Sequence, residues 1–137
     1  MNIDSIRNGY VIDHIKAGKA MEIYDRLELS KLDVPVAMIM GASSKRTGKK
    51  DIIKIDGEIE INMDVIGYVD PGATVNTIKN CELIDKRKIE EPEFLVDVLR
   101  CKNPRCITST EQEIKHKFRL TDPNKHEYRC VYCDTKG

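Results

Sequence analysis

Four cysteines near the end of the chain are the residues best suited to chemistry. They stand in two close pairs: four residues separate Cys101 from Cys106, and two residues separate Cys130 from Cys133. Each short spacing turns the backbone so that both sulfurs of a pair can face one ion. Two such pairs can place four thiolates at the corners of a tetrahedron, the arrangement that Zn²⁺ favours in structural sites. Two disulfides, or four unrelated buried thiols, are the alternatives.

The beginning of the chain bears on that choice. No secretory signal is expected there, because Asp4, Arg7 and Asp13 interrupt any apolar run. We therefore expect a cytoplasmic protein, whose reducing surroundings disfavour disulfides. A site of four thiolates leaves no open position for water or substrate, so its ion would be structural. The prediction is one structural Zn²⁺ per chain with these ligands: Cys101, Cys106, Cys130 and Cys133.

Composition limits the remaining possibilities. The chain has 137 residues, of which 34% are charged, and a formal net charge of zero. A dense basic face, the usual mark of nucleic-acid binding, is not expected. No apolar run approaches the roughly 20 residues that span a bilayer, so no membrane segment is expected either. After residue 99 few large apolar side chains remain, and metal binding, worth on the order of 10–16 kcal/mol in small zinc modules, would have to stabilise that segment.

The apolar pattern predicts an α+β fold for the first two thirds of the chain. Strands are expected at residues 10–15, 34–40, 50–56, 73–78 and 81–85, and helices at 16–30 and 62–69, with a polar loop at 41–50. This order is that of the ferredoxin-like fold with one added edge strand. Its helices cover one face of an antiparallel sheet. The first helix is expected to bury one apolar stripe: Ala17, Ala20, Met21, Tyr24 and Leu27.

A charged, proline-marked stretch at 86–93 is interpreted as a linker. It divides the chain into a first domain of residues 1–92 and a second of residues 93–137, where a zinc-ribbon-like unit would begin with a strand at 94–99.

The sequence contains no convincing catalytic motif. The segment 41–50 departs from a phosphate-binding loop in the spacing of its glycines and in its last residue. His116 and His126 are interpreted as surface residues, and Cys81 as a small packed hydrophobe.

A polar cluster is expected on the sheet of the first domain. Its members lie on three predicted strands or directly after a fourth: Asp13 and His14 end the first strand, Lys54 and Asn76 lie on two others, and Lys86 follows the last. Lysines bind phosphates as point charges, and an aspartate commonly holds ribose hydroxyls. The cluster therefore suits a nucleotide, while a solvated sheet face with ordinary surface charges explains the same residues. The pattern alone leaves both open.

Three segments and the cysteine spacing together resemble a known family. The segments are Val11–Ile15 (VIDHI), Gly48–Ile55 (GKKDIIKI) and Ala73–Asn76 (ATVN). With the Cys101-x4-Cys106 and Cys130-x2-Cys133 pairs, they resemble the regulatory chain of aspartate carbamoyltransferase. The resemblance runs from about Ile6 to Cys133, which is nearly the whole chain.

The resemblance implies a non-catalytic subunit in pyrimidine biosynthesis. It implies that residues 1–92 form an allosteric domain binding CTP or ATP, and that residues 93–137 form a zinc domain contacting the catalytic chain. It also implies a regulatory-chain homodimer within a dodecamer. A free-standing zinc-ribbon protein that binds nucleic acid is the alternative, and its aromatic-rich basic face is not evident in the sequence.

The resemblance also implies roles for the residues of the nucleotide site. Asp13 and Lys54 would serve the ribose, and His14, Asn76 and Lys86 would lie near the phosphates. The remaining residues would border the base or close the pocket from the N-terminal side: Ile6, Ile78 and Leu83, and then Ile3 and Asp4. Cys81 is a departure, because the family commonly has an aromatic residue there.

Overall fold

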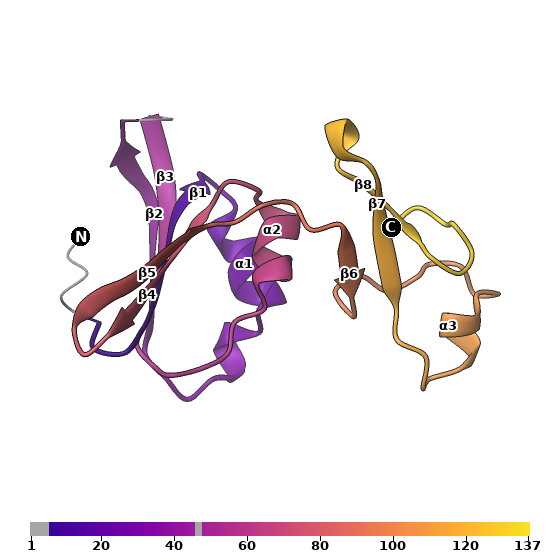
Figure 1. Ribbon diagram of the computed structural model, residues 1–137, viewed down its shortest axis with the longest axis horizontal. Helices are drawn as coiled ribbons and strands as arrows, with labels where there is room; N and C mark the ends of the chain where they lie inside the picture. Colours follow the sequence, from indigo (N-terminus) through magenta and orange to yellow (C-terminus); the bar gives the residue numbers. More distant parts are fainter. Residues whose placement is uncertain (1–5, 46–47) are drawn as a thin grey trace. The chain divides into compact units, whose positions relative to one another are not determined.

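The computed structural model describes residues 6–45 and 48–137, which divide into two compact units (Figure 1). The first is Met1–Glu90 and the second is Glu91–Gly137. This division lies two residues before the boundary expected from the charged linker.

The first unit is built on a five-stranded antiparallel sheet, in the order β2-β3-β1-β4-β5. Two helices, α1 and α2, follow β1 and β3 in the chain, and both lie against one face of the sheet (Figure 1). This arrangement confirms the α+β class and the ferredoxin-like pattern with an added edge strand. The elements are β1 Gly9–Lys16, α1 Ala20–Arg26, the 3₁₀ turn η2 Leu29–Lys31, β2 Val36–Ser44, β3 Gly48–Ile55, α2 Met63–Val69, β4 Thr74–Lys79 and β5 Glu82–Lys88.

Alternation along the strands gives this sheet two different faces. Ile12, Ile53 and Val75 point to the helices and belong to a large buried cluster. A smaller cluster occupies the opposite face: Ile6, Val11, Ile52 and Ile78. Because side chains alternate with period two, the polar residues between these apolar ones are divided between the faces as well.

The prediction for the first helix is wrong in length and in part of its stripe. Helix α1 begins only at Ala20 and ends at Arg26. Its buried positions are Ala20 and Ile23, while Met21 is 48% exposed. Since the helix starts later than expected, its core-facing positions are set by Ala20 and the residue three further on, and Met21 turns towards solvent.

Three further expectations need correction. The predicted polar loop at 41–50 is largely sheet, because β2 continues to Ser44 and β3 already begins at Gly48. The predicted linker begins too early, since β5 continues to Lys88. Cys81 is exposed, because Asn80 and Cys81 both have left-handed backbone angles (φ 52° and 66°) in the turn between β4 and β5. Helix α2 is capped by the Asn62 side chain, which accepts from the backbone N–H of Asp64.

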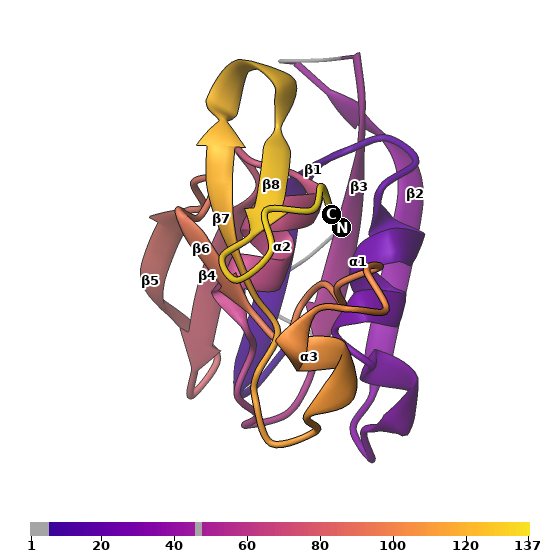
Figure 2. The ribbon, with the colours of Figure 1, turned by 90° about the vertical axis from the view of Figure 1, so that its right-hand side faces the viewer.

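The second unit contains a three-stranded antiparallel sheet in the order β6-β7-β8, and its strands can be followed in Figure 2. Its buried apolar side chains are few among the described residues: Leu95, Phe118 and Tyr128. The strand expected at 94–99 ends at Val96, because Asp97 has a φ of 57°. The elements are β6 Phe94–Val96, α3 Ile107–Thr110, β7 Lys117–Asp122, the 3₁₀ turn η3 Pro123–Lys125 and β8 Glu127–Cys130. Within the described part of the chain, no helix is long and apolar enough to cross a membrane.

Candidate metal centre and nucleotide site

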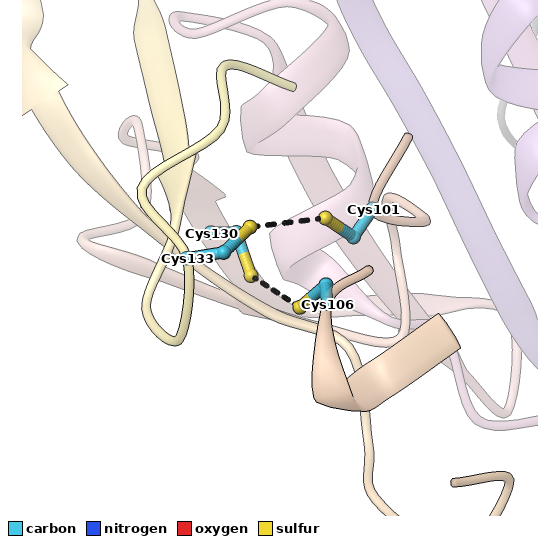
Figure 3. A group of neighbouring side chains, drawn as sticks. All are labelled: Cys101, Cys106, Cys130 and Cys133. Carbon is cyan, nitrogen blue, oxygen red and sulfur yellow. Dashed lines mark hydrogen bonds between the residues drawn. The ribbon is translucent and has the colours of Figure 1, made fainter. Parts of the chain in front are cut away.

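The four cysteines of the second unit converge on one point. Their sulfur atoms all lie within 4.8 Å of one another. Cys101 comes from the loop after β6, Cys106 directly precedes α3, and Cys130 ends β8, with Cys133 in the turn that follows. The sulfurs of Cys101 and Cys133 are 3.5 Å apart and those of Cys106 and Cys130 are 3.7 Å apart (Figure 3). The two pairs thus approach each other from different ends of the segment.

These separations fit a tetrahedral zinc centre. With Zn–S bonds of about 2.3 Å, the sulfurs of a regular tetrahedron lie about 3.8 Å apart. The observed distances are close to this edge length, whereas a disulfide requires a sulfur–sulfur bond of about 2.0 Å. Four thiolates complete the coordination shell, so the ion would crosslink the unit and offer no position for catalysis. The donor set is that of one structural zinc ion.

Each cysteine pair contains one thiol that ionises readily and one that does not. The Thr108 hydroxyl donates to the Cys106 sulfur at 3.1 Å and lowers the pKa of that thiol. Thr135, whose hydroxyl oxygen is also 3.1 Å from its cysteine, lowers the pKa of Cys133 to about 6. Burial raises the pKa of Cys101 and of Cys130. Binding a dication to all four as thiolates therefore releases protons, and its apparent affinity rises with pH.

His116 supports the first cysteine pair, which the sequence did not suggest. The backbone N–H of Cys101 donates to Nδ1 of His116 at 3.1 Å. Two hydrogen bonds hold the backbone of His116 against Asp97. The backbone N–H of His116 donates to the Asp97 carboxylate at 3.0 Å, and the backbone N–H of Asp97 donates to the His116 carbonyl at 2.7 Å. The interpretation of His116 as a plain surface residue is therefore wrong. His126 is exposed, as expected, and pairs with Glu91.

The predicted nucleotide residues of the first unit share a row across the sheet. Val11 is paired with Lys54 on β3 and with Asn76 on β4, and Asn76 is paired with Lys86 on β5. Residues paired directly across neighbouring strands project from the same face, so these side chains lie on the face away from the helices. Three strand spacings of about 4.8 Å separate the two lysines, giving a row about 14 Å long.

Burial differs along that row. Lys54 is only 2% exposed, whereas Lys86 lies on the exposed edge strand β5. Between them, the side-chain oxygen of Asn76 is buried and has no hydrogen-bond partner among the described residues. This oxygen can accept a hydrogen bond from a bound water or ligand.

Asp13 and His14 lie at a bulge near the end of β1. His14 has a φ of 57°, a left-handed conformation that is uncommon for this residue. Its N–H donates to the Asp13 carboxylate at 2.6 Å, and its Nδ1 is 3.3 Å from the Thr74 hydroxyl. Partial burial opposes ionisation of Asp13, but the Lys50 ammonium at 2.9 Å and the His14 N–H hold the pKa of that carboxyl below its usual value.

The residues expected around the base of the nucleotide differ in how deeply they are buried. Ile6 and Ile78 are buried together in the smaller apolar cluster, and Leu83, paired with Ile78 across the strands, is half exposed. Ile3 and Asp4 lie outside the described residues. A cavity of about 620 Å³ reaches His14 and is lined in addition by Lys16, Ser44, Lys49 and Asp70 among others.

Comparison with known proteins decides what these two sites belong to. Residues 1–90 match the family model described as aspartate carbamoyltransferase regulatory chain, allosteric domain. Residues 93–137 match the model described as aspartate carbamoyltransferase regulatory chain, metal binding domain. The chain belongs to the aspartate carbamoyltransferase regulatory chain family.

Individual relatives agree over nearly the full length. The aspartate carbamoyltransferase regulatory chains of Clostridium acetobutylicum and Clostridium botulinum are 46% and 48% identical over 134 residues, covering 98% of this chain and 92% of each relative. That of Bifidobacterium longum is 42% identical over 137 residues, covering 100% of this chain and 99% of the relative. A regulatory chain is a non-catalytic subunit, and its metal binding domain contains the four-cysteine centre described above.

Membership in this family implies a catalytic chain as partner. It also confirms the resemblance carried by the three sequence segments and the cysteine spacing. The free-standing zinc-ribbon alternative is not favoured, because the metal binding domain occurs here together with an allosteric domain.

Proposed function

We propose that the first unit binds CTP and ATP and that the second holds the catalytic chain through its zinc centre. In this proposal residues 1–92 are the allosteric domain and residues 93–137 the contact domain. Pairs of regulatory chains join catalytic chains in a cytoplasmic dodecamer. Nucleotide binding favours one arrangement of that complex and shifts its equilibrium, a coupling typically worth about 1–3 kcal/mol.

The row from Lys54 through Asn76 to Lys86 is the observation that carries the nucleotide proposal. It combines two ammonium groups with a buried amide oxygen that has no hydrogen-bond partner among the described residues, on the sheet face away from α1 and α2. The amide oxygen would accept a hydrogen bond from the nucleotide, and Lys86 at the edge would reach the phosphates. Lys16 and Lys49, which line the cavity next to His14, add positive charge at the end of β1. An anion with a hydrogen-bonding sugar and base suits this combination.

Calorimetric titration of CTP and ATP into the full zinc-loaded chain tests this site. A charge-assisted contact is worth about 1.5–3 kcal/mol, so Lys86→Ala is expected to weaken binding about tenfold or more. Arg87→Ala is the matched control, because it removes the same charge from the next residue of β5, which faces the other side of the sheet. Wild-type chain that binds neither nucleotide at millimolar concentration, or equal losses in the two variants, would contradict the assignment.

Exposed apolar side chains next to the zinc ligands support the second part of the proposal. Ile107 follows Cys106 and is 46% exposed, and Tyr132 lies between Cys130 and Cys133 and is 52% exposed. Tyrosine is enriched at the anchoring positions of protein interfaces. Both side chains depend on the cysteine centre for their positions, so loss of the metal would also remove the surface to which the catalytic chain binds.

Co-purification of tagged regulatory chain with the catalytic chain tests that surface. Tyr132→Ala is expected to weaken the complex by about 2 kcal/mol or more, as for an interface anchor, without loss of zinc. Met21→Ala is the control, since Met21 is an equally exposed apolar side chain of the first unit. If Tyr132→Ala assembles as well as wild type, the contact surface is elsewhere.

The free edges of the first sheet support a homodimer. Strand β2 is nine residues long, contains no charged side chain and exposes Met40 by 57%. The other edge, β5, has five charged residues among its seven. Charged side chains block edge-to-edge pairing, so β2 is the edge on which a second copy can add its own β2 strand. We assign the dimer contact to β2, and a charge placed there, as in Met40→Lys, should give monomers in sedimentation experiments.

A further inference from the structure

We propose that the buried carboxylate of Asp51 positions both the nucleotide end of β1 and the edge strand β2, and thereby couples nucleotide binding to pairing of the two regulatory chains. The proposal rests on the proposed function, since it concerns the regulation of that same nucleotide site. Asp51 lies on β3, between β1 and the edge strand β2, and is only 1% exposed.

Both neighbours of β3 are irregular where they pass Asp51. On β1 the register moves from Ile12 opposite Ile53 to Ile15 opposite Asp51, so two residues, Asp13 and His14, face Ile52 alone. On β2 the register moves from Ile39 opposite Ile52 to Ala42 opposite Lys50, so Met40 and Gly41 together face Asp51. Each neighbour therefore has one extra residue, and bulges of this kind serve to redirect side chains.

The Asp51 side chain joins these two irregularities. One carboxylate oxygen accepts from the backbone N–H of Gly41 in the β2 bulge, at 3.0 Å. The other accepts from the N–H groups of Gly18 and Ala20, at 2.9 and 3.3 Å, in the turn that follows β1. A carboxylate can accept all three hydrogen bonds at once because both of its oxygens are acceptors only.

The residues at the two ends of this connection belong to the two proposed contacts. The β1 bulge contains Asp13 and His14, which are proposed to contact the nucleotide. The β2 bulge contains Met40 and Gly41, and Met40 is the exposed side chain of the edge assigned to the second copy. A movement of the β1 end when nucleotide binds therefore acts, through Gly18, Ala20 and Asp51, on the shape of the pairing edge. Such a link between two contacts is reciprocal: pairing changes nucleotide affinity by the same factor.

Asp51→Asn separates this coupling role from a general contribution to stability. The substitution keeps shape and size but replaces one acceptor oxygen by an amide that donates. Whichever way the amide turns, either the β2 bulge or the turn after β1 loses its acceptor, so the connection is broken in both orientations. Ile53→Val is the matched control, because Ile53 is a fully buried neighbour on the same face of β3, and the change makes a small cavity without touching either bulge.

The experiment measures the dimer dissociation constant of the zinc-loaded chain by analytical ultracentrifugation, with and without saturating CTP. In wild type, the ratio of the dissociation constants measured with and without CTP is expected to differ from one by about fivefold or more, which is the lower range of allosteric couplings. Asp51→Asn is expected to bring the ratio within about twofold of one, and Ile53→Val to leave it at the wild-type value. The proposal is overturned if Asp51→Asn keeps the wild-type ratio of dissociation constants. It is also overturned if Ile53→Val brings that ratio as close to one as Asp51→Asn does.

Two further outcomes separate this proposal from the function on which it rests. If the wild-type chain binds CTP and dimerises but its ratio is one, the coupling is wrong and the proposed function stands. If it neither binds nor dimerises, both are wrong. Should Asp51→Asn fail to fold, hydrogen exchange on the wild-type chain decides instead: CTP is expected to slow exchange of the Gly41 amide, and no change there overturns the coupling.

Discussion

The two units of this chain reach a fixed structure by different means. The first buries a continuous set of aliphatic side chains between its sheet and two helices, and the residues of the proposed nucleotide site lie on the other face of the sheet. The second buries only a few apolar side chains and brings four cysteines to one point instead. In the proposed function, the nucleotide site therefore lies on the unit without the cysteine centre, and the contact surface lies on the unit that contains it.

The strongest test of this difference removes one zinc ligand. Cys130→Ser replaces a thiolate with a poor ligand, so the second unit is expected to lose most of a metal-binding free energy on the order of 10 kcal/mol and to unfold. The first unit should stay folded because its core lies entirely within itself. Hydrogen exchange read separately for the two units, together with zinc content, provides the measurement.

Cys81→Ser is the control for that variant, since Cys81 is exposed and lies outside the four-cysteine group. It should change neither zinc content nor exchange. Unfolding of both units in Cys130→Ser would show that the first unit does not fold independently of the zinc centre.

The reverse test weakens the core of the first unit. Ile66 on α2 is fully buried, and Ile66→Ala is expected to destabilise the first unit by about 2–5 kcal/mol through the cavity that it leaves. Zinc content should not change. Urea denaturation followed in the first unit measures the effect, and Met21→Ala, at an exposed position of α1, should change stability by no more than about 0.5 kcal/mol. Zinc loss in Ile66→Ala would refute independent folding.

A smaller effect on zinc release is expected from removing the hydrogen bond between His116 and the backbone of Cys101. His116→Ala leaves the Cys101 N–H without its acceptor and should cost about 1 kcal/mol of zinc-site stability, seen as faster zinc transfer to a chelator. His116→Asn offers a side-chain oxygen near the position of Nδ1 and should restore much of the slow release. Equal rates in the two variants would mean that His116 contributes only by packing.

The smallest expected effect is a loss of stability of the first unit at low pH. The pKa of Asp13 is held below its ordinary value of about 3.9. The stability it contributes is therefore present above that value and is lost as pH falls through the lowered folded value. Because the Asp13–Lys50 pair is partly exposed, we expect no more than about 1 kcal/mol.

Hydrogen exchange of the first unit, in wild type and Asp13→Asn, measures this pH dependence without interference from zinc loss in the second. The variant should lose less stability than wild type between about pH 5 and pH 2. Identical pH profiles would show that the carboxylate is not stabilised in the folded chain.

Spacing and period made some features predictable and left others hidden. The cysteine pairs fixed the metal centre because a short loop constrains where both sulfurs can point. The approximate positions of the strands followed from their runs and alternation of apolar residues. These are local properties that each segment carries by itself.

The features that the sequence did not predict depend on contacts between segments far apart in the chain. Asp51 looks like any polar residue between Lys50 and Ile52, and only the pairing of β3 with two bulged neighbours shows its role. The loop expected at 41–50 became sheet because two polar strand ends can pair with each other without an apolar pattern. His116 gained its role from a hydrogen bond to a residue 15 positions away.

The unequal edges of the first sheet also determine what kind of assembly the chain can form. If β2 could pair with β5, each added copy would present a new β2 edge, and the chain could grow into an endless fibre. The charges of β5 oppose that head-to-tail contact. The proposed pairing of β2 with β2 would occupy both uncharged edges and leave only the charged β5 edges outside, so growth would stop at two copies. In that proposal, the charged residues of β5 protect the protein against polymerisation, and β2 remains the edge for a partner.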